Sequence, residues 1–172
     1  MVAANLNALG SGTVQVRQYV YQAPPANGSV TVSDLFWTGP GRLLVPERGT
    51  DTLFEVNLEG AVDITPLEDS AGRLIADPTR TLEQLNPAAL AAAGIVPVTR
   101  SVVIPSLTQI DPLLEKVEGV CVVGNFIALM YDNDFDVAES AVIPLNPMPK
   151  GPFVELELTG GYLPKVFLVP LP

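Results

Sequence analysis

Short stretches of alternating hydrophobic and polar residues follow one another along most of the chain, and Gly, Pro, Asn and Asp separate them. A period of two is typical of half-buried antiparallel strands. The expected strands are residues 13–21, 30–37, 42–45, 52–58, 118–123, 126–131, 153–158 and 165–169. Glycine turns separate several neighbours in this series, and the last two strands are expected to pair around Gly160 and Gly161. The pattern predicts an all-β, antiparallel fold.

The middle of the chain has a different pattern and predicts an insertion over residues 67–114. Asn86 is a candidate N-cap, Pro87 stands at the first helical position, and an alanine-rich run ends at Gly94. We therefore expect one short helix, within residues 86–93, inside this insertion.

Two of the expected hairpins resemble each other. The segment that starts at Asp34 can be aligned with the one that starts at Glu118, 84 positions later. Propeller blades repeat at about 40–45 residues, so this offset fits two blades, or one blade that carries the insertion. The alternative is that any two hairpins share such a pattern. The repeat favours an antiparallel β-propeller-like fold, in the form of a partial propeller.

Composition narrows the class of protein. The length of 172 residues fits one domain, residues 1–172. Hydrophobic residues make up 48% of the chain and charged residues 16%, a composition that excludes a disordered chain. The 14 glycines and 17 prolines do not suit a helical bundle. A net charge of −10 repels phosphate backbones, so nucleic acid is not an expected partner.

Single residue types exclude further classes. The chain has no histidine, which rules out Ser-His-Asp and Cys-His catalysis and a histidine zinc site within it. Its one cysteine, Cys121, cannot form an intramolecular disulfide and is interpreted as a small core residue. No stretch reaches the roughly 18 apolar residues of a membrane span. The first sixteen residues lack the Lys and Arg of a signal peptide.

Oxygen-bearing side chains gather after the strand at 126–131, where Asp132, Asn133 and Asp134 are consecutive. Hard oxygen ligands of this kind suit Ca²⁺, so these three residues are candidate metal ligands. An EF-hand is excluded because Val137 stands where that loop needs glycine. The alternative is a turn in which Asp and Asn side chains bond nearby backbone amides.

Two further residues are candidates for chemistry at strand ends. Glu118 begins a strand beside Gly119 and is a candidate both for catalysis and as a fourth calcium ligand, or else a solvated strand-end residue. Arg48 follows an apolar strand, where a guanidinium can bind phosphate or carboxylate. It can equally pair with a neighbouring acid.

Several segments, in their order along the chain, resemble the phytase-like family, also called the "esterase-like activity of phytase" domain. The segments are 33–35 (SDL), 41–49 (GRLLVPERG), 53–58 (LFEVNL), 117–120 (VEGV) and 128–135 (ALMYDNDF). This family consists of bacterial β-propellers that are secreted or periplasmic. The resemblance covers residues 30–172 and matches the C-terminal part of the family, which implies a propeller incomplete at its N-terminus.

The resemblance implies a secreted or periplasmic hydrolase of phosphoesters or esters that acts on a small molecule. The oxygen-bearing residues at the strand ends add the hypothesis that Ca²⁺ is its cofactor. In this reading Asp132, Asn133, Asp134 and Glu118 hold the ion, and Arg48 neutralises developing charge. The alternative is a non-catalytic β-propeller module that binds a partner, since propellers host unrelated functions. A partial propeller leaves apolar blade faces uncovered, so we also expect self-association.

Overall fold

The computed structural model describes residues 2–4, 16–23, 30–71, 73–75, 77–131 and 166–171. Within these ranges every strand pair is antiparallel, and the helical elements are one α-helix and short 3₁₀ turns. The expected all-β, antiparallel class is confirmed. The described strands form no closed sheet.

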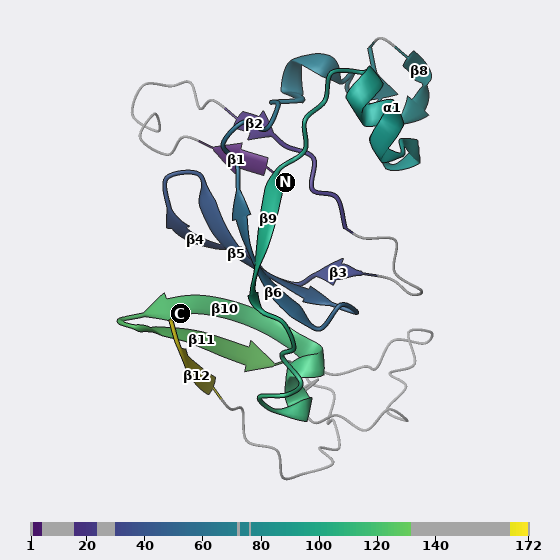
Figure 1. The fold of residues 1–172 in the computed structure, drawn as a ribbon. Coiled ribbons are helices and arrows are strands. Elements are labelled where there is room, and N and C mark those ends of the chain that lie inside the picture. The colour runs from purple at the N-terminus through teal and green to yellow at the C-terminus, as the bar shows by residue number, and fades with distance from the viewer. Residues whose placement is uncertain are drawn as a thin grey trace, which may run out of the picture.

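The first sheet lies at the centre of the molecule (Figure 1). Its strands are β3 (Thr31–Val32) and β4 (Phe36–Gly39), which both pair with β5 (Arg42–Arg48), followed by β6 (Thr52–Asn57) and β9 (Thr99–Ile104). The predicted hairpin is confirmed, and Gly41, with φ of 70°, supplies the left-handed residue of its turn. The predicted strand at 30–37 is broken between β3 and β4.

The strand β9 lies inside the range that the sequence assigns to the insertion. It pairs with β6 and thereby completes the first sheet, with Val56 opposite Arg100. The register shifts between Leu53 and Phe54, so the side chains of β9 do not follow one simple alternation. The sequence pattern did not predict this strand.

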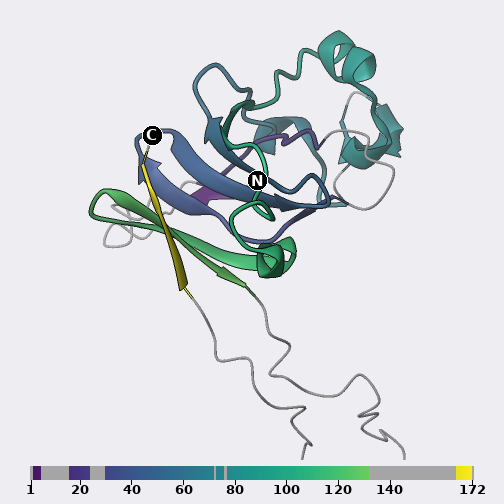
Figure 2. The ribbon, with the colours of Figure 1, turned by 60° about the horizontal axis from the view of Figure 1, so that its bottom comes forward.

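The second sheet contains β10 (Val117–Val123), β11 (Phe126–Tyr131) and β12 (Val166–Pro170), in that order. The predicted hairpin of β10 and β11 is confirmed, with Gly124 at φ of 59° in its turn. The strand β12 pairs with β11, as Figure 2 shows. The strand expected at 153–158 lies outside the described residues.

The segment between β6 and β9 contains small elements: η2 (Thr65–Leu67), β7 (Arg73–Leu74), β8 (Asp77–Thr81), η3 (Leu82–Gln84) and α1 (Pro87–Ala92). The helix α1 confirms the predicted helix, since Asn86 accepts a hydrogen bond from the Ala89 amide (2.9 Å) as its N-cap. The base of the segment is closed by a hydrogen bond from the Val62 amide to the Val96 carbonyl (2.9 Å).

Among the described strands, β1 (Val2–Ala4) and β2 (Val16–Gln18) pair with each other and with no other strand. Of the strand predicted for residues 13–21, the described part forms a strand over Val16–Gln18, and residues 19–21 lie outside it. The Tyr19 side chain is buried against the first sheet, so the chain leaves β2 to pack its aromatic residues.

Three clusters of buried side chains hold these elements together. One lies between the two sheets and includes Leu53 and Leu129, together with Leu114 of η4 (Pro112–Lys116). A second covers the opposite face of the first sheet, around Val45. A third lies beneath α1, around Leu90. The first sheet is therefore packed on both faces, and the second sheet lies against one of them (Figures 1 and 2).

The two aligned hairpins are also linked to each other. Asp34, in the break between β3 and β4, accepts a hydrogen bond from the Val120 amide of β10 (2.8 Å). The first pairs of the two hairpins, Gly39 with Arg42 and Val123 with Phe126, are again 84 positions apart. No helix in the described part of the chain is long and apolar enough to cross a membrane.

Candidate functional site

The structure brings two of the predicted site residues into direct contact. Arg48 at the end of β5 donates a hydrogen bond from Nη1 to Oε1 of Glu118 at the start of β10. Their side chains are 34% and 36% exposed, so the pair lies at the surface between the two sheets. This geometry corresponds to the pairing with a neighbouring acid that the sequence left open for Arg48.

The other predicted ligands, Asp132, Asn133 and Asp134, lie outside the described residues. The last described residue before them is Tyr131, which pairs with Val117, the neighbour of Glu118. Within the described ranges no group of three Asp, Glu, Cys or His side chains could hold a metal ion. The calcium site therefore stays a prediction.

A second cluster of polar side chains, deeper than this pair, centres on Glu47. Glu47 shares a face of β5 with Leu43 and Val45, so its carboxylate is turned into the packed side of the sheet. Its side chain is 0% exposed. Three groups donate hydrogen bonds to it: the Tyr21 hydroxyl, Nη1 of Arg100 and the Thr50 hydroxyl (2.9 Å).

Arg100 is the cation of this cluster. Its guanidinium carbon lies 4.6 Å from the centroid of the Phe54 ring and 5.7 Å from that of Tyr21. Both distances are within the range of cation–π attraction. The Arg100 side chain is 25% exposed, so it joins the buried carboxylate to solvent. Strands β5, β6 and β9 thus each contribute one member of the cluster.

The hydroxyl of Tyr21 is held in its neutral form. Burial, followed by the hydrogen bond to Glu47, raises the pKa of Tyr21 above its ordinary value. The hydroxyl therefore remains a donor toward Glu47 over the physiological range. A neutral donor and a cation together compensate one buried carboxylate.

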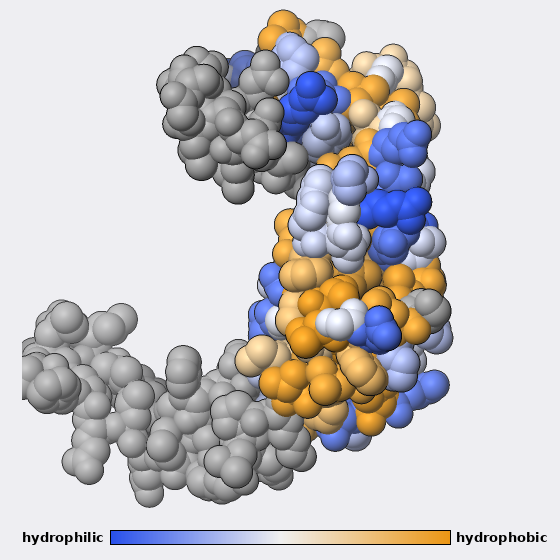
Figure 3. Space-filling view, turned by 90° about the vertical axis from the view of Figure 1, so that its left-hand side faces the viewer, coloured by the Kyte–Doolittle hydropathy of each residue, from blue (hydrophilic) through white to orange (hydrophobic). Residues whose placement is uncertain are grey.

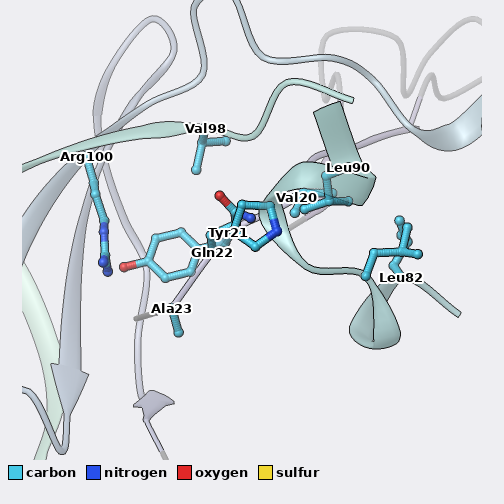
Figure 4. A pocket seen from close by; sticks show the side chains of 10 residues that line it. Val20, Tyr21, Gln22, Ala23, Leu82, Leu90, Val98 and Arg100 are labelled. Atoms are coloured by element: carbon cyan, nitrogen blue, oxygen red, sulfur yellow. The ribbon is translucent and has the colours of Figure 1, made fainter. Parts of the chain in front are cut away.

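A cavity of about 610 Å³ opens beside this cluster (Figure 4). Figure 4 shows the Tyr21 ring pointing toward the Arg100 guanidinium, with Leu82 and Leu90 further along the cavity. One wall comes from the first sheet and the residues after β2, and the other from η3 and α1. Its apolar lining residues are Val20, Ala23, Leu82, Leu85, Pro87, Leu90 and Val98. The cavity thus combines an apolar wall with a fixed guanidinium and a phenol.

A second set of hydrogen bonds to a carboxylate lies in the turn between β5 and β6, at Asp51. Asp51 accepts hydrogen bonds from the Ser106 hydroxyl and from the amide (2.8 Å) and hydroxyl (2.7 Å) of Thr108. Burial acts to raise the pKa of Asp51, but these hydrogen bonds outweigh it and lower the pKa below its ordinary value. Both carboxylate oxygens of Asp51 accept hydrogen bonds from Ser106 and Thr108, which follow β9. The role of Asp51 is therefore to join the β5–β6 turn to the chain after β9.

Sequence reasoning did not single out Arg100, because it lies in the range interpreted as an insertion. A signal for Glu47 was present: it continues the alternation of Leu43 and Val45, so it falls on the buried face. A carboxylate on a buried face requires a cation or donors nearby.

Comparison of the chain with protein-family models, with curated proteins and with solved structures gives no match. The resemblance to the phytase-like family therefore stays a hypothesis based on the sequence segments alone.

Proposed function

We propose that this chain is a β-propeller-like binding module whose cavity takes a small organic anion with an apolar tail. The observation that carries the proposal is the Arg100 guanidinium, fixed on the cavity wall by the fully buried carboxylate of Glu47. Function is assigned to this site and not to the fold, because propellers host many unrelated activities.

The arrangement of the sheets supports the propeller-like part of the proposal. In the first sheet β5, β6 and β9 follow each other in chain order, as in the antiparallel meander of a propeller blade. The second sheet begins the same way with β10, β11 and β12 and packs face to face on the first. Two consecutive antiparallel sheets that pack face to face are the arrangement of two neighbouring propeller blades.

The chemistry of the cavity supports an anion. Arg100 donates from Nη1 to Glu47 and also interacts with the Tyr21 hydroxyl, while a guanidinium has five N–H donors, more than these two partners require. The stack on Phe54 holds its plane, and a planar fork matches a carboxylate. The leucines of η3 and α1 provide the surface for an apolar tail.

Octanoate should bind, as measured by isothermal titration calorimetry, while octylamine should give no heat and octanol should bind at least about tenfold more weakly. The carboxylate gains a charge-assisted hydrogen bond that the alcohol lacks, and the amine is repelled by Arg100. Because each buried methylene contributes about 0.8 kcal/mol, hexanoate should bind roughly tenfold more weakly than octanoate.

The matched variants are Arg100→Lys and Arg42→Lys. An ammonium opposite Glu47 keeps the buried charge paired but offers no fork to a second carboxylate, so Arg100→Lys should weaken octanoate binding at least about tenfold. Arg42 belongs to the same sheet and pairs with Glu55 at the surface, so its substitution should leave binding unchanged. Equal affinities for octanoate and octanol, or an unaffected Arg100→Lys variant, would contradict the proposal.

A second candidate function is the hydrolysis of phosphate or carboxylate esters by a secreted or periplasmic protein. The observation that favours it is that the fold brings Arg48 and Glu118, which the sequence assigns to one site, to the same surface, although the two side chains are there paired with each other. The described residues do not by themselves provide a calcium site, because Glu118 is paired with Arg48. No reaction step is therefore assigned to the ion.

The calcium hypothesis predicts that millimolar Ca²⁺ raises the melting temperature relative to chelator, by mass action on the folded state. It also predicts that hydrolysis of p-nitrophenyl phosphate or a p-nitrophenyl ester requires Ca²⁺. Both effects should disappear in the double variant Asp132→Ala, Asp134→Ala and persist in Asp63→Ala, Asp69→Ala, which removes the same charge elsewhere. An identical melting temperature with Ca²⁺ and chelator would reject the calcium site, and absence of turnover would reject the hydrolase.

A further inference from the structure

The wall of the cavity beside Arg100 carries one polar side chain that the cluster around Glu47 does not use. The polar side chains that line the cavity are those of Tyr21, Gln22 and Arg100, and all its lining residues belong to the described part of the chain. Tyr21 and Arg100 both donate hydrogen bonds to Glu47. The third polar group, the carboxamide of Gln22, stands outside this cluster.

The Gln22 side chain is partly buried, and it forms no hydrogen bond with the residues that the structure describes. A carboxamide has two N–H donors and an acceptor oxygen. The carboxamide of Gln84 provides a contrast, because it accepts a hydrogen bond from the Thr81 amide (3.0 Å) and caps η3. A structural role therefore accounts for Gln84 but not for Gln22.

Apolar surface alone does not define a ligand. Hydrophobic residues also gather on the side of the molecule that Figure 3 shows, over the lower half of the described part. The cavity differs because two polar groups stand among its apolar residues, the guanidinium of Arg100 and the carboxamide of Gln22. A few placed polar groups on an apolar wall fix the orientation and the identity of a bound small molecule.

An aliphatic chain that fills the cavity removes water from the Gln22 carboxamide. A chain of methylene groups alone offers no hydrogen bond in exchange, which lowers its affinity. A hydroxyl group can donate to Oε1 of Gln22, and an oxo group can accept from its Nε2. We propose, building on the anion site proposed above, that Gln22 determines the specificity of the cavity and selects a carboxylate whose aliphatic chain carries a hydroxyl or oxo group.

The place of Gln22 sets the place of that group along the ligand. Gln22 directly follows Tyr21, whose ring points toward Arg100 in Figure 4, and the Cα atoms of consecutive residues are about 3.8 Å apart. Leu82 and Leu90 lie further along the cavity. The hydroxyl or oxo group is therefore expected in the half of the chain next to the carboxylate, and the end of the chain is expected among the leucines.

Isothermal titration calorimetry with hydroxylated octanoates tests the proposal. The tighter of the two acids hydroxylated at the third or the fifth carbon should bind about tenfold more tightly than octanoate, because its hydroxyl satisfies the carboxamide. The acid hydroxylated at its last carbon should bind more weakly than octanoate, since its hydroxyl is placed among Leu82 and Leu90.

The test variant is Gln22→Leu, with Gln109→Leu as its control. Leucine removes the polar group, so Gln22→Leu should bind octanoate at least as tightly as the unmodified chain and lose the preference for the hydroxylated acid. A purely structural role of Gln22 would instead weaken both acids by the same factor. Gln109 is exposed after β9 and does not line the cavity, so its variant should keep the preference. Circular dichroism verifies that each variant is folded.

Three outcomes would overturn the proposal. Equal affinities of the unmodified chain for octanoate and for the acids hydroxylated at the third and fifth carbons would show that Gln22 selects nothing. A preference that persists in Gln22→Leu would assign the hydroxyl to another residue. In both cases octanoate still binds and Arg100→Lys still weakens it, so the anion site itself stands. Absence of heat with every acid would reject the anion site and this inference together.

Discussion

Replacing Arg100 with alanine is expected to lower the free energy of unfolding by about 3–5 kcal/mol in urea denaturation followed by circular dichroism. The reason is Glu47, whose side chain is 0% exposed and whose charge Arg100 compensates. Without the guanidinium, a carboxylate is left in the packed face of the first sheet with neutral donors alone. The cation–π contacts with Phe54 and Tyr21 are lost as well.

The control is Arg42→Ala, which removes an exposed ion pair with Glu55 (2.9 Å) on the same sheet and should cost less than about 1 kcal/mol. The double variant Arg100→Met, Glu47→Leu removes both charges and fills the space with apolar groups. It should recover most of the loss, because a buried pair is costly mainly when one partner is left alone. A loss in Arg100→Ala no greater than that in Arg42→Ala would show that Glu47 is not a buried charge.

The second large effect is expected at Asp51. Asp51→Ala should cost about 3 kcal/mol, because it removes the acceptor for Ser106 and Thr108 and places alanine at φ of 59°. Asp51→Asn is the matched variant, since asparagine tolerates this conformation and keeps one acceptor oxygen. It should cost less than alanine at neutral pH.

The pH dependence of this difference follows from the pKa. The folded-state pKa of Asp51 is lowered, so the charged carboxylate stabilises the folded state above the unfolded pKa near 4. That contribution is lost as the pH falls through the folded-state pKa. The stability gap between the unmodified chain and Asp51→Asn should therefore be constant near neutrality and shrink below about pH 4. A gap that does not change with pH would contradict the network.

The sequence pattern predicted those strands whose partners lie nearby in the chain. The hairpins of β4 with β5 and of β10 with β11 alternate regularly and turn at glycines, so their local pattern is sufficient. The strand β9 was missed because its partner β6 is distant and its register is shifted. The alternation over residues 13–21 predicted a strand that is too long at its C-terminal end. The chain leaves β2 after Gln18, because Tyr19 packs into the core cluster around Val45.

The candidate site divides in the same way. Arg48 and Glu118 could be singled out because each ends or begins an evident strand, and the structure brings them together. Arg100 could not be found, because its significance arises only when β9 joins the sheet and carries it over Phe54 toward Glu47. Long-range pairing of this kind leaves no periodic signal in a single sequence.

The hydrogen bond that closes the base of the segment between β6 and β9 makes the two walls of the cavity structurally separable. Because the Val62 amide and the Val96 carbonyl hold the ends of that segment together, its length and content can change without disturbing the sheet. Leu82 and Leu90 belong to this segment, whereas Arg100 belongs to β9 of the first sheet. Under the proposed binding function, a chain grafted with a different segment between Val62 and Val96 would keep the guanidinium of Arg100 and change the apolar wall of the cavity.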